Sequence, residues 1–450
     1  MRSTPKFFAR PCRPLAALLL LCAGGAAAAP LPVPAVIAEE DVYELVPPGN
    51  GAGPLWCFGC TVIARHGARV IVSQMETGEG VPLLCNTRWR LLERTEAGWK
   101  PFAEAEGYRQ REPCPVGVTA DNGLFLYVND SLHPPGAHYL DCEPHLLRFD
   151  LAGGAPEKAS PAWNIEKPYF TDHSYRGFAT DGPRSELLML NIDANTSIQH
   201  WAHLDRAGKT LANGGISFPI RSCYPQVALK DRAAHVLAIG DIVEPVEAWR
   251  QFKFEQTGQK WDYVFRILYH TSTPKIGDQP FSEPLEIANV DETAGHITNH
   301  DLWIAPDGSA YVLYSETEVQ SAMMRDKFFP GKSILPSLHL AVVKDGAITG
   351  RQVLIAGTDT IQPGSARFHQ TPDGHLYAFA YIANDDPGNY LIPIYPAPEA
   401  PAQVKVPLAA PFSAFCLANI RGGTAPSNTI DIFGHSKSGT TLSYAQVELR

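Results

Sequence analysis

The stretch from Asp301 to Tyr314, DLWIAPDGSAYVLY, consists of an apolar run, a tight turn and a second apolar run. Asp-Gly between two alternating apolar runs is the strongest short-range signal of a β-hairpin. The same phrase returns at residues 62–72, 115–128, 176–190, 225–239, 366–380 and 414–433. Its turns are anchored at Gly67, Asp121, Asp181, Asp231, Asp307, Asp373 and Gly423, which are 50 to 76 residues apart. A repeated all-β unit at this spacing indicates a β-propeller.

The remaining strands of each unit follow the hairpin. A third apolar run lies at 89–92, 146–151, 198–204, 264–270, 338–343, 390–395 and 442–449, and a fourth at 99–103, 216–219, 284–287, 349–355 and 404–408. The last unit has no fourth strand, whereas residues 41–46 form a spare one near the start. The sequence therefore predicts an all-β fold, a seven-bladed β-propeller of four-stranded antiparallel blades closed by the N-terminal strand.

The first 29 residues differ from the rest. Arg2, Lys6, Arg10 and Arg13 precede an apolar stretch, and a small-residue tract leads into Pro30. This pattern predicts a secretory signal peptide at 1–29, a single propeller domain at 30–450, and a secreted or periplasmic protein without membrane insertion. Removing these four positive charges changes the formal net charge from −10 to −14, which argues against nucleic-acid binding. We expect a monomer.

Polar residues should gather on one face of such a ring. The loop leading into the first strand of each blade and the loop between its second and third strands open on the same face, around the central channel. Sorted in this way, the charged residues, histidines and tyrosines collect there, which predicts a ligand site. Aromatic residues in the fourth-blade insertion, 241–262, would stack on sugar rings, cover the channel mouth or pack against the next blade.

Three groups of residues carry candidate chemistry. Asp172 to Arg176 leads into the third blade, with His200 in the next loop, and a histidine or tyrosine beside an arginine suits proton abstraction. The arginines Arg111, Arg176, Arg221, Arg367 and Arg421 would bind anionic groups or pair within the ring. His133, His138, Cys142 and His145 are candidate metal ligands, and surface loop residues are the alternative.

The sequence Trp56-Cys-Phe-Gly-Cys60 superficially copies a thioredoxin redox motif. That motif requires a strand-to-helix turn, and here it runs into a β-hairpin. We therefore expect structural cysteines or a disulfide.

With its signal peptide and repeated blades, the chain resembles secreted seven-bladed propellers of the sialidase-like, BNR-type superfamily. The sialidase motifs are degenerate: only Pro219-Ile220-Arg221 stands for the Phe-Arg-Ile-Pro motif. The chain is closer in character to the propeller polysaccharide lyases that act on glycans such as ulvan. Those enzymes use His and Tyr as acid and base, and Arg to neutralise a uronate. The resemblance implies these roles for His173, His200, Tyr224 or Tyr263, and for Arg176 or Arg221.

The leading hypothesis is an exported polysaccharide lyase that cleaves uronate-containing glycans by β-elimination. The alternatives are a sialidase-like glycoside hydrolase and a non-catalytic glycan- or protein-binding propeller. The substrate would be an acidic polysaccharide or a sialoside, no cofactor is required, and structural Zn²⁺ or Ca²⁺ is left open. The catalytic candidates are His173, Tyr175, His200 and Tyr224; the substrate-binding candidates are Arg111, Arg176, Arg221, Tyr263, His300 and Arg367.

Overall fold

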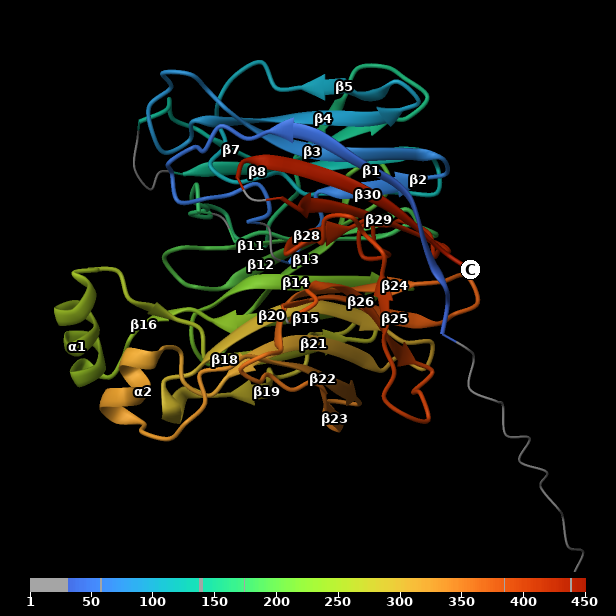
Figure 1. Cartoon of the computed structure of the whole chain (residues 1–450). Helices are drawn as coiled ribbons and strands as arrows, with labels where there is room; N and C mark the ends of the chain where they lie inside the picture. The colour runs from blue at the N-terminus through green and yellow to red at the C-terminus, as the bar shows by residue number, and fades with distance from the viewer. Residues whose placement is uncertain (1–30, 57–58, 137–140, 174, 384, 438) are drawn as a thin grey trace, which may run out of the picture. The chain divides into compact units, whose positions relative to one another are not determined.

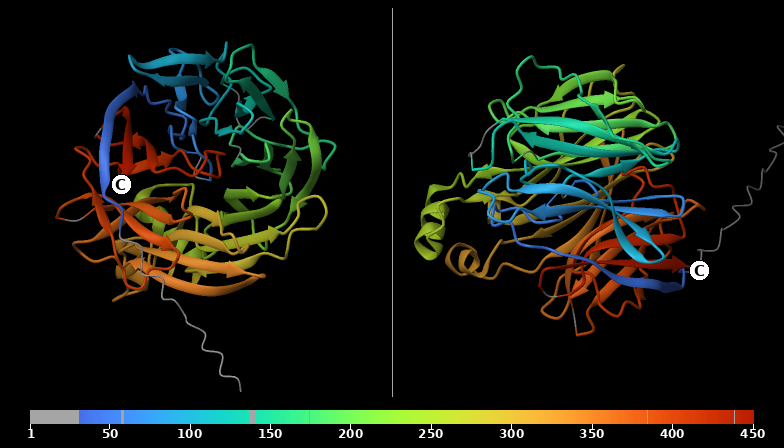
Figure 2. Two further views of the ribbon diagram at one scale, coloured as in Figure 1. Left: turned by 90° about the vertical axis from the view of Figure 1, so that its right-hand side faces the viewer. Right: turned by 90° about the horizontal axis from the view of Figure 1, so that it is seen from above.

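Seven four-stranded antiparallel sheets follow one another around a ring in a computed structural model (Figure 2). The structure describes residues 31–56, 59–136, 141–173, 175–383, 385–437 and 439–450. Residues 31–450 form one compact unit. The predicted seven-bladed β-propeller is confirmed, while the proposed signal peptide lies outside the described residues.

Each blade is a meander whose first strand lies nearest the channel. The strands are, in blade 1, β2 (Ile63–His66), β3 (Arg69–Thr77), β4 (Thr87–Thr95) and β5 (Gly98–Glu104); in blade 2, β6 (Val116–Val118), β7 (Gly123–Ser131), β8 (Cys142–Asp150) and β9 (Glu157–Ala159); in blade 3, β10 (Gly177–Asp181), β11 (Glu186–Ile192), β12 (Gln199–Leu204) and β13 (Thr210–Ile216); in blade 4, β14 (Ser222–Lys230), β15 (Ala233–Gly240), β18 (Ile267–Thr273) and β19 (Leu285–Asn289); in blade 5, β20 (His296–Ile304), β21 (Ala310–Thr317), β22 (Ser337–Lys344) and β23 (Ala347–Ile355); in blade 6, β24 (Gln362–Gln370), β25 (Leu376–Ala383), β26 (Gly388–Tyr395) and β27 (Val404–Val406); and in blade 7, β28 (Ala414–Leu417), β29 (Thr429–His435), β30 (Thr441–Leu449) and β1 (Pro34–Glu44).

The N-terminal strand closes the ring. β1 pairs antiparallel with β30, from Pro34 opposite Leu449 to Glu44 opposite Thr441, and the two lie side by side in Figure 2. The strand begins seven residues before the predicted Asp41, because the outer edge of a blade accepts polar residues such as Glu39 and Glu40 on its solvent face. Closure leaves the last blade with a full set of strands.

Two predicted strand positions in blades 3 and 4 were wrong. The fourth strand of blade 3 is 210–216 rather than 216–219. Its Gly214 and Gly215 suggest a turn, but the Trp201 indole lies over Gly214, where an added Cβ would come within 2.5 Å of the ring. An aromatic covering glycine on a neighbouring strand lets a glycine pair remain in a sheet. The third strand of blade 4 is shifted to 267–273, because residues 263–264 pair within the insertion.

Two insertions project from one face of the ring (Figure 1). Blade 4 carries β16 (Ile242–Val243), α1 (Glu247–Thr257) and β17 (Tyr263–Val264) between its second and third strands, and blade 5 carries α2 (Ala322–Phe328) in the same place. The helices pack through Phe252 and Phe328, whose ring centroids are 5.3 Å apart. Neither helix is long and apolar enough to span a bilayer, and the described residues contain no other α-helix.

The inter-blade core contains several neutral histidines. Burial lowers the pKa of His235 and His369 to about 4, and that of His270 and His300 to about 3. His235 Nδ1 lies 3.1 Å from His270 Nε2. Because the folded pKa is below the unfolded value, the unfolded chain binds more protons, and stability is lost as pH falls from about 6.5 towards 3.

We therefore predict that the free energy of unfolding declines from pH 7 to pH 5, and that His270→Gln reduces this dependence. One buried histidine contributes up to about 1.4 kcal/mol per pH unit to the free energy of unfolding. Denaturant melts at several pH values measure the slope. The matched change at His66, which is only half-buried and lies outside the inter-blade core, is His66→Gln, and it should leave the slope unaltered. An equal slope in His270→Gln and the unmodified protein would contradict the prediction.

Candidate functional site

The loops leading into the first strands of blades 1 to 4 and the blade-4 insertion bring a group of polar and aromatic residues together. We call it the shelf cluster: Trp56, Glu112, His173, Tyr175, Arg221, Tyr224, Asp241 and Tyr263. The His173 and Tyr175 rings have centroids 4.1 Å apart, and the Tyr175 and Tyr224 rings 4.8 Å apart. Trp56 lies 6.1 Å from His173 and 6.3 Å from Tyr224. The predicted proximity of His173, Tyr175, Arg221 and Tyr224 is thus present in the structure.

His173 is oriented by a buried carboxylate. Its Nδ1 lies 2.5 Å from Glu112 Oε1. Burial alone would raise the pKa of Glu112, but the hydrogen bond from His173 and the nearby Arg176 and Arg111 guanidinium groups bring it below its ordinary value. An ionised Glu112 accepts the Nδ1 proton, so in the singly protonated imidazole Nε2 is the nitrogen that can take up a further proton. This is the arrangement of a general base held by a carboxylate.

Arg221 is anchored on one edge and flanked by aromatic rings. Its Nη1 lies 2.7 Å from Asp241 Oδ2 and donates to the Asp241 carbonyl at 2.8 Å. The guanidinium carbon is 5.0 Å from the Tyr175 ring centroid and 5.9 Å from that of Tyr263. The side chain is 29% exposed. Nη1 is committed to Asp241, and the exposed part of the guanidinium group carries the charge that can bind a carboxylate.

Tyr175 and Tyr224 are held protonated in an unusual backbone conformation. Burial, and next the charge of Asp241, raise the pKa of both phenols, and Tyr175 hydrogen bonds with Arg221 and Tyr224. Both residues have positive φ, 46° and 50°, which is uncommon for non-glycine residues and concentrates at functional sites. A neutral phenol can donate a proton to a leaving oxygen.

Two predicted arginines support the shelf cluster from behind. The Arg176 side chain is 1% exposed and donates to the carbonyls of Tyr127, at 2.8 Å, and Pro113, at 2.7 Å. It therefore supports Glu112 rather than facing a ligand. Arg111 is 11% exposed, donates from Nε to the Asn50 carbonyl, and has Nη1 at 3.4 Å from Asp172. Arg111 therefore connects the loop that contains Asn50 with the loop that contains Asp172.

Three other predicted residues lie in the inter-blade core. His200 Nδ1 contacts Asn164 at 2.6 Å, and its ring packs on Phe170. His300 bonds to Ser315 at 2.7 Å, and Arg367 is 7% exposed and donates to the Ala366 carbonyl. The sequence had placed His300 and Arg367 in loops, but β20 and β24 begin earlier, so both lie within strands. None of their contacts in the described chain involves the shelf cluster.

The predicted metal ligands are separated. His133 Nε2 lies 2.6 Å from Asp141, and His145 Nδ1 lies 3.0 Å from the Glu143 carbonyl, while Cys142 is buried at the start of β8. Among described residues, no group of three His, Cys, Asp or Glu side chains is placed to hold a metal ion. His138 lies outside the described residues.

The described cysteines do not form a redox centre. Cys60, Cys85 and Cys114 are buried thiols, and burial raises their pKa to about 11, about 12 and about 11. Such thiols are poor nucleophiles. Cys57 lies outside the described residues.

Sequence reasoning missed the two carboxylates that orient the site. Glu112 and Asp241 lie in loops on the predicted ligand face, but the sequence did not predict them as the partners of His173 and Arg221. Their separations, 61 and 20 residues, reveal no pairing. The signal that could have found them is their position on the same face of the ring. Glu112 lies in the loop before blade 2, next to the loop of blade 3 that carries His173, and Asp241 lies in the same blade as Arg221. Trp56 was not predicted as a site residue, because residues 56–60 were interpreted only as a cysteine motif.

Solved structures with the same fold include carbohydrate-active enzymes. A PL25 ulvan lyase bound to -[GlcA(1-4)Rha3S]- superimposes with a TM-score of 0.56 at 9% identity, covering 91% of this chain and 94% of that one. The polysaccharide lyase Uly1 gives 0.52 at 10% identity, covering 92% and 99%. At such identity the likeness shows the fold. No protein-family model matches the sequence, and no curated protein does either.

Proposed function

We propose that this propeller is an exported, monomeric polysaccharide lyase that cleaves uronate-containing glycans by β-elimination. One observation carries the proposal: the partly exposed Arg221 guanidinium lies against Tyr175, whose ring is the neighbour of the His173–Glu112 pair. The propeller lyases of the same fold support it, because one of them binds a glucuronate-containing ligand. Secretion, and membership of the sialidase-like superfamily, rest on the sequence pattern alone.

In the first step, the partly exposed guanidinium group of Arg221 binds the uronate carboxylate. This charge pairing increases the acidity of the C5–H bond and stabilises the enolate-like transition state. His173 Nε2 takes the C5 proton, and Glu112 stabilises the imidazolium that forms. Asp241 keeps Arg221 in place during this step.

In the second step, the electron pair from C5 forms the C4=C5 double bond as the C4–O4 bond breaks. Tyr175 donates its proton to the departing O4. The proton on His173 can then return to Tyr175, because their rings are neighbours at 4.1 Å. The chemistry uses side chains of this chain alone and needs no cofactor. His200 has no step, since its contacts lie elsewhere.

The proposal is tested with a panel of uronate polysaccharides and sialosides, following ultraviolet absorbance and reducing ends together. Elimination leaves an unsaturated, absorbing product, whereas hydrolysis adds water and leaves none. Both signals rising together on a uronate substrate supports the lyase. Reducing ends without absorbance support the sialidase-like hydrolase, and binding without either signal supports a non-catalytic glycan-binding propeller.

Trp261→Ala is predicted to weaken binding of long substrates. Trp261 is 74% exposed in the blade-4 insertion, two residues from Tyr263, which contacts Arg221. One aromatic stacking contact contributes about 0.5–1.5 kcal/mol to the binding free energy, so its loss should increase KM about two- to tenfold. The KM for oligosaccharides too short to reach it should not change.

Kinetics on polymer and on short oligosaccharides check this prediction. Phe254→Ala is the matched control, because Phe254 is an exposed aromatic on α1 of the same insertion, at 47%. Equal changes in KM for long and short substrates would show that Trp261 acts through the fold and not through the substrate.

A further inference from the structure

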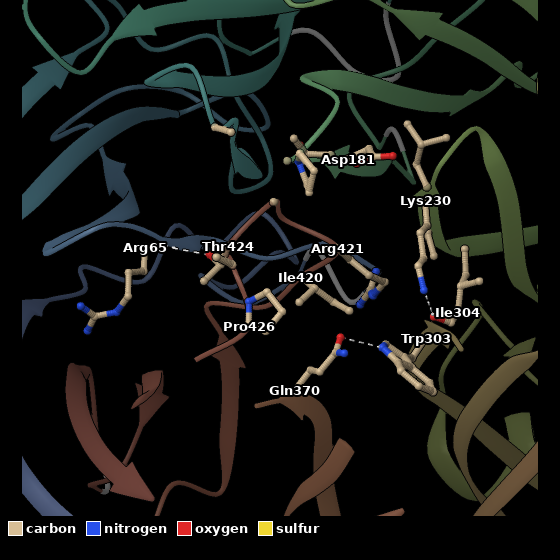
Figure 3. A pocket seen from close by; sticks show the side chains of 18 of the residues that line it. Arg65, Asp181, Lys230, Trp303, Ile304, Gln370, Ile420, Arg421, Thr424 and Pro426 are labelled. Carbon is tan, nitrogen blue, oxygen red and sulfur yellow. Dashed lines mark hydrogen bonds between the residues drawn. The ribbon is translucent and has the colours of Figure 1, made fainter. Parts of the chain in front are cut away.

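A cavity of about 620 Å³ opens on the face of the ring opposite the shelf cluster. Its walls are the turns between first and second strands, and all seven blades contribute (Figure 3). β14 begins beside Arg221 and ends at Lys230, which lines the cavity. At about 3.3 Å per residue the two positions are about 30 Å apart. The cavity shares no residue with the shelf cluster.

The inner end of the cavity is closed by what we call the channel loop, residues 418–428 between β28 and β29. Thr180 and Val118 donate to the carbonyls of Arg421 and Gly422, at 2.7 and 2.8 Å. The Arg421 side chain bonds to Asp301 at 2.6 Å and to the Gly59 carbonyl at 2.8 Å. The channel loop is thus held in place before a ligand binds, which reduces the conformational entropy lost on binding.

Most of the lining is apolar or small. Leu229, Ile304, Ile420, Ala425 and Pro426 are among the residues that form it. Ligand pockets of about 300–1,000 Å³ with mainly apolar walls and few polar groups are typical of small-molecule sites. Trp303 is only 1% exposed, so it offers no open aromatic face for a sugar ring.

The charges in the wall differ in their partners. Arg65 forms an ion pair with Asp431, and Arg421 with Asp301. Asp181 accepts from the backbone amides of Asp231 and Arg184. Lys230 is half-buried, and its Nζ bonds to the Ile304 carbonyl at 3.3 Å. It makes no ion pair within 4.0 Å with any described residue, while the carboxylates of Asp231, Asp181 and Asp307 act on it at longer range. Figure 3 shows this ammonium group directed towards Ile304.

We propose that this cavity binds a small organic carboxylate with a compact apolar body. The carboxylate would pair with Lys230 Nζ, and the body would displace water from the side chains of Ile304, Ile420 and Pro426. A half-buried ammonium without an ion-pair partner favours an anion, because its own hydration is already reduced. The mainly apolar walls disfavour a polyanion or a bare sugar.

Calorimetry with a series of para-alkyl benzoates and the matched benzamides tests the proposal on the signal-free protein. The benzoates should bind and the benzamides should bind about ten- to a hundredfold more weakly. Lys230→Met should cause the same loss for the benzoates. Lys344→Met is the control on the same face, since Lys344 pairs with Asp307 outside the cavity.

A second variant guards against a change in folding. Ala425→Trp fills the cavity from an exposed position without altering Lys230, and should abolish binding. Equal affinity for acid and amide, binding that survives both variants, or no binding by any benzoate would each overturn the proposal.

Discussion

Arg221→Gln is expected to lower kcat/KM on a uronate polysaccharide by a factor of about 1,000 or more. Removing one donor from an electrostatic site typically costs about 100- to 1,000-fold, and here the whole charge that neutralises the carboxylate is lost. Glutamine keeps an amide donor for the Asp241 carbonyl, so that the buried Asp241, 1% exposed, retains a partner. Steady-state kinetics and a denaturant melt of the same preparation measure the effect.

The matched control for Arg221 is Arg184→Gln. Arg184 is a partly exposed arginine near the opposite mouth of the ring, 3.7 Å from Glu186. The Arg184→Gln variant has the same change of residue type and charge, but Arg184 does not contact the shelf cluster, so kcat/KM should remain within about twofold. Arg221→Gln with near-normal kcat/KM would remove Arg221 from the mechanism. A collapse of stability in this variant alone would show a structural role instead.

Tyr175→Phe is expected to lower kcat by a factor of about 100 to 10,000, the range for a general acid. The change removes only the hydroxyl, and the ring keeps its contacts with His173, at 4.1 Å, and Tyr224, at 4.8 Å. KM should change little, since the leaving oxygen is protonated only in the transition state. Rapid-mixing kinetics on a defined uronate oligosaccharide give kcat and KM separately.

Two other tyrosines provide the comparison for Tyr175. Tyr263→Phe removes a hydroxyl from a ring that also contacts Arg221, and should retain activity. Tyr224→Phe should have a smaller effect than Tyr175→Phe, because Tyr224 acts as the hydrogen-bond neighbour of Tyr175. A larger loss in Tyr224→Phe than in Tyr175→Phe would reassign the proton donor to Tyr224.

The architecture could be predicted because each blade repeats its own local signal. Asp-Gly turns between period-2 apolar runs specify hairpins without reference to the rest of the chain. The N-terminal strand was predictable because the last unit lacked one. The strand ends were less predictable, because a glycine pair such as Gly214–Gly215 suggests a turn until Trp201, on the neighbouring strand, covers it.

The site was predictable only where its residues flank a strand start. His173 lies four residues before β10 and Arg221 one residue before β14, so topology alone places them at the channel mouth. His300 and Arg367 were expected in the corresponding loops of blades 5 and 6. Strands β20 and β24 begin before them, so both side chains lie within a blade and are buried in the core. Which side chain orients which, as Glu112 does His173, depends on contacts between blades that no local pattern encodes.

The most direct test of the lyase account compares one uronate polysaccharide with its carboxyl-reduced derivative. Ultraviolet absorbance and reducing ends are followed together after addition of the protein without residues 1–29. The account predicts that both rise in equal molar amounts on the uronate and that neither rises on the reduced polymer, since Arg221 has no carboxylate to bind. Reducing ends formed without absorbance, or equal cleavage of both polymers, would contradict it.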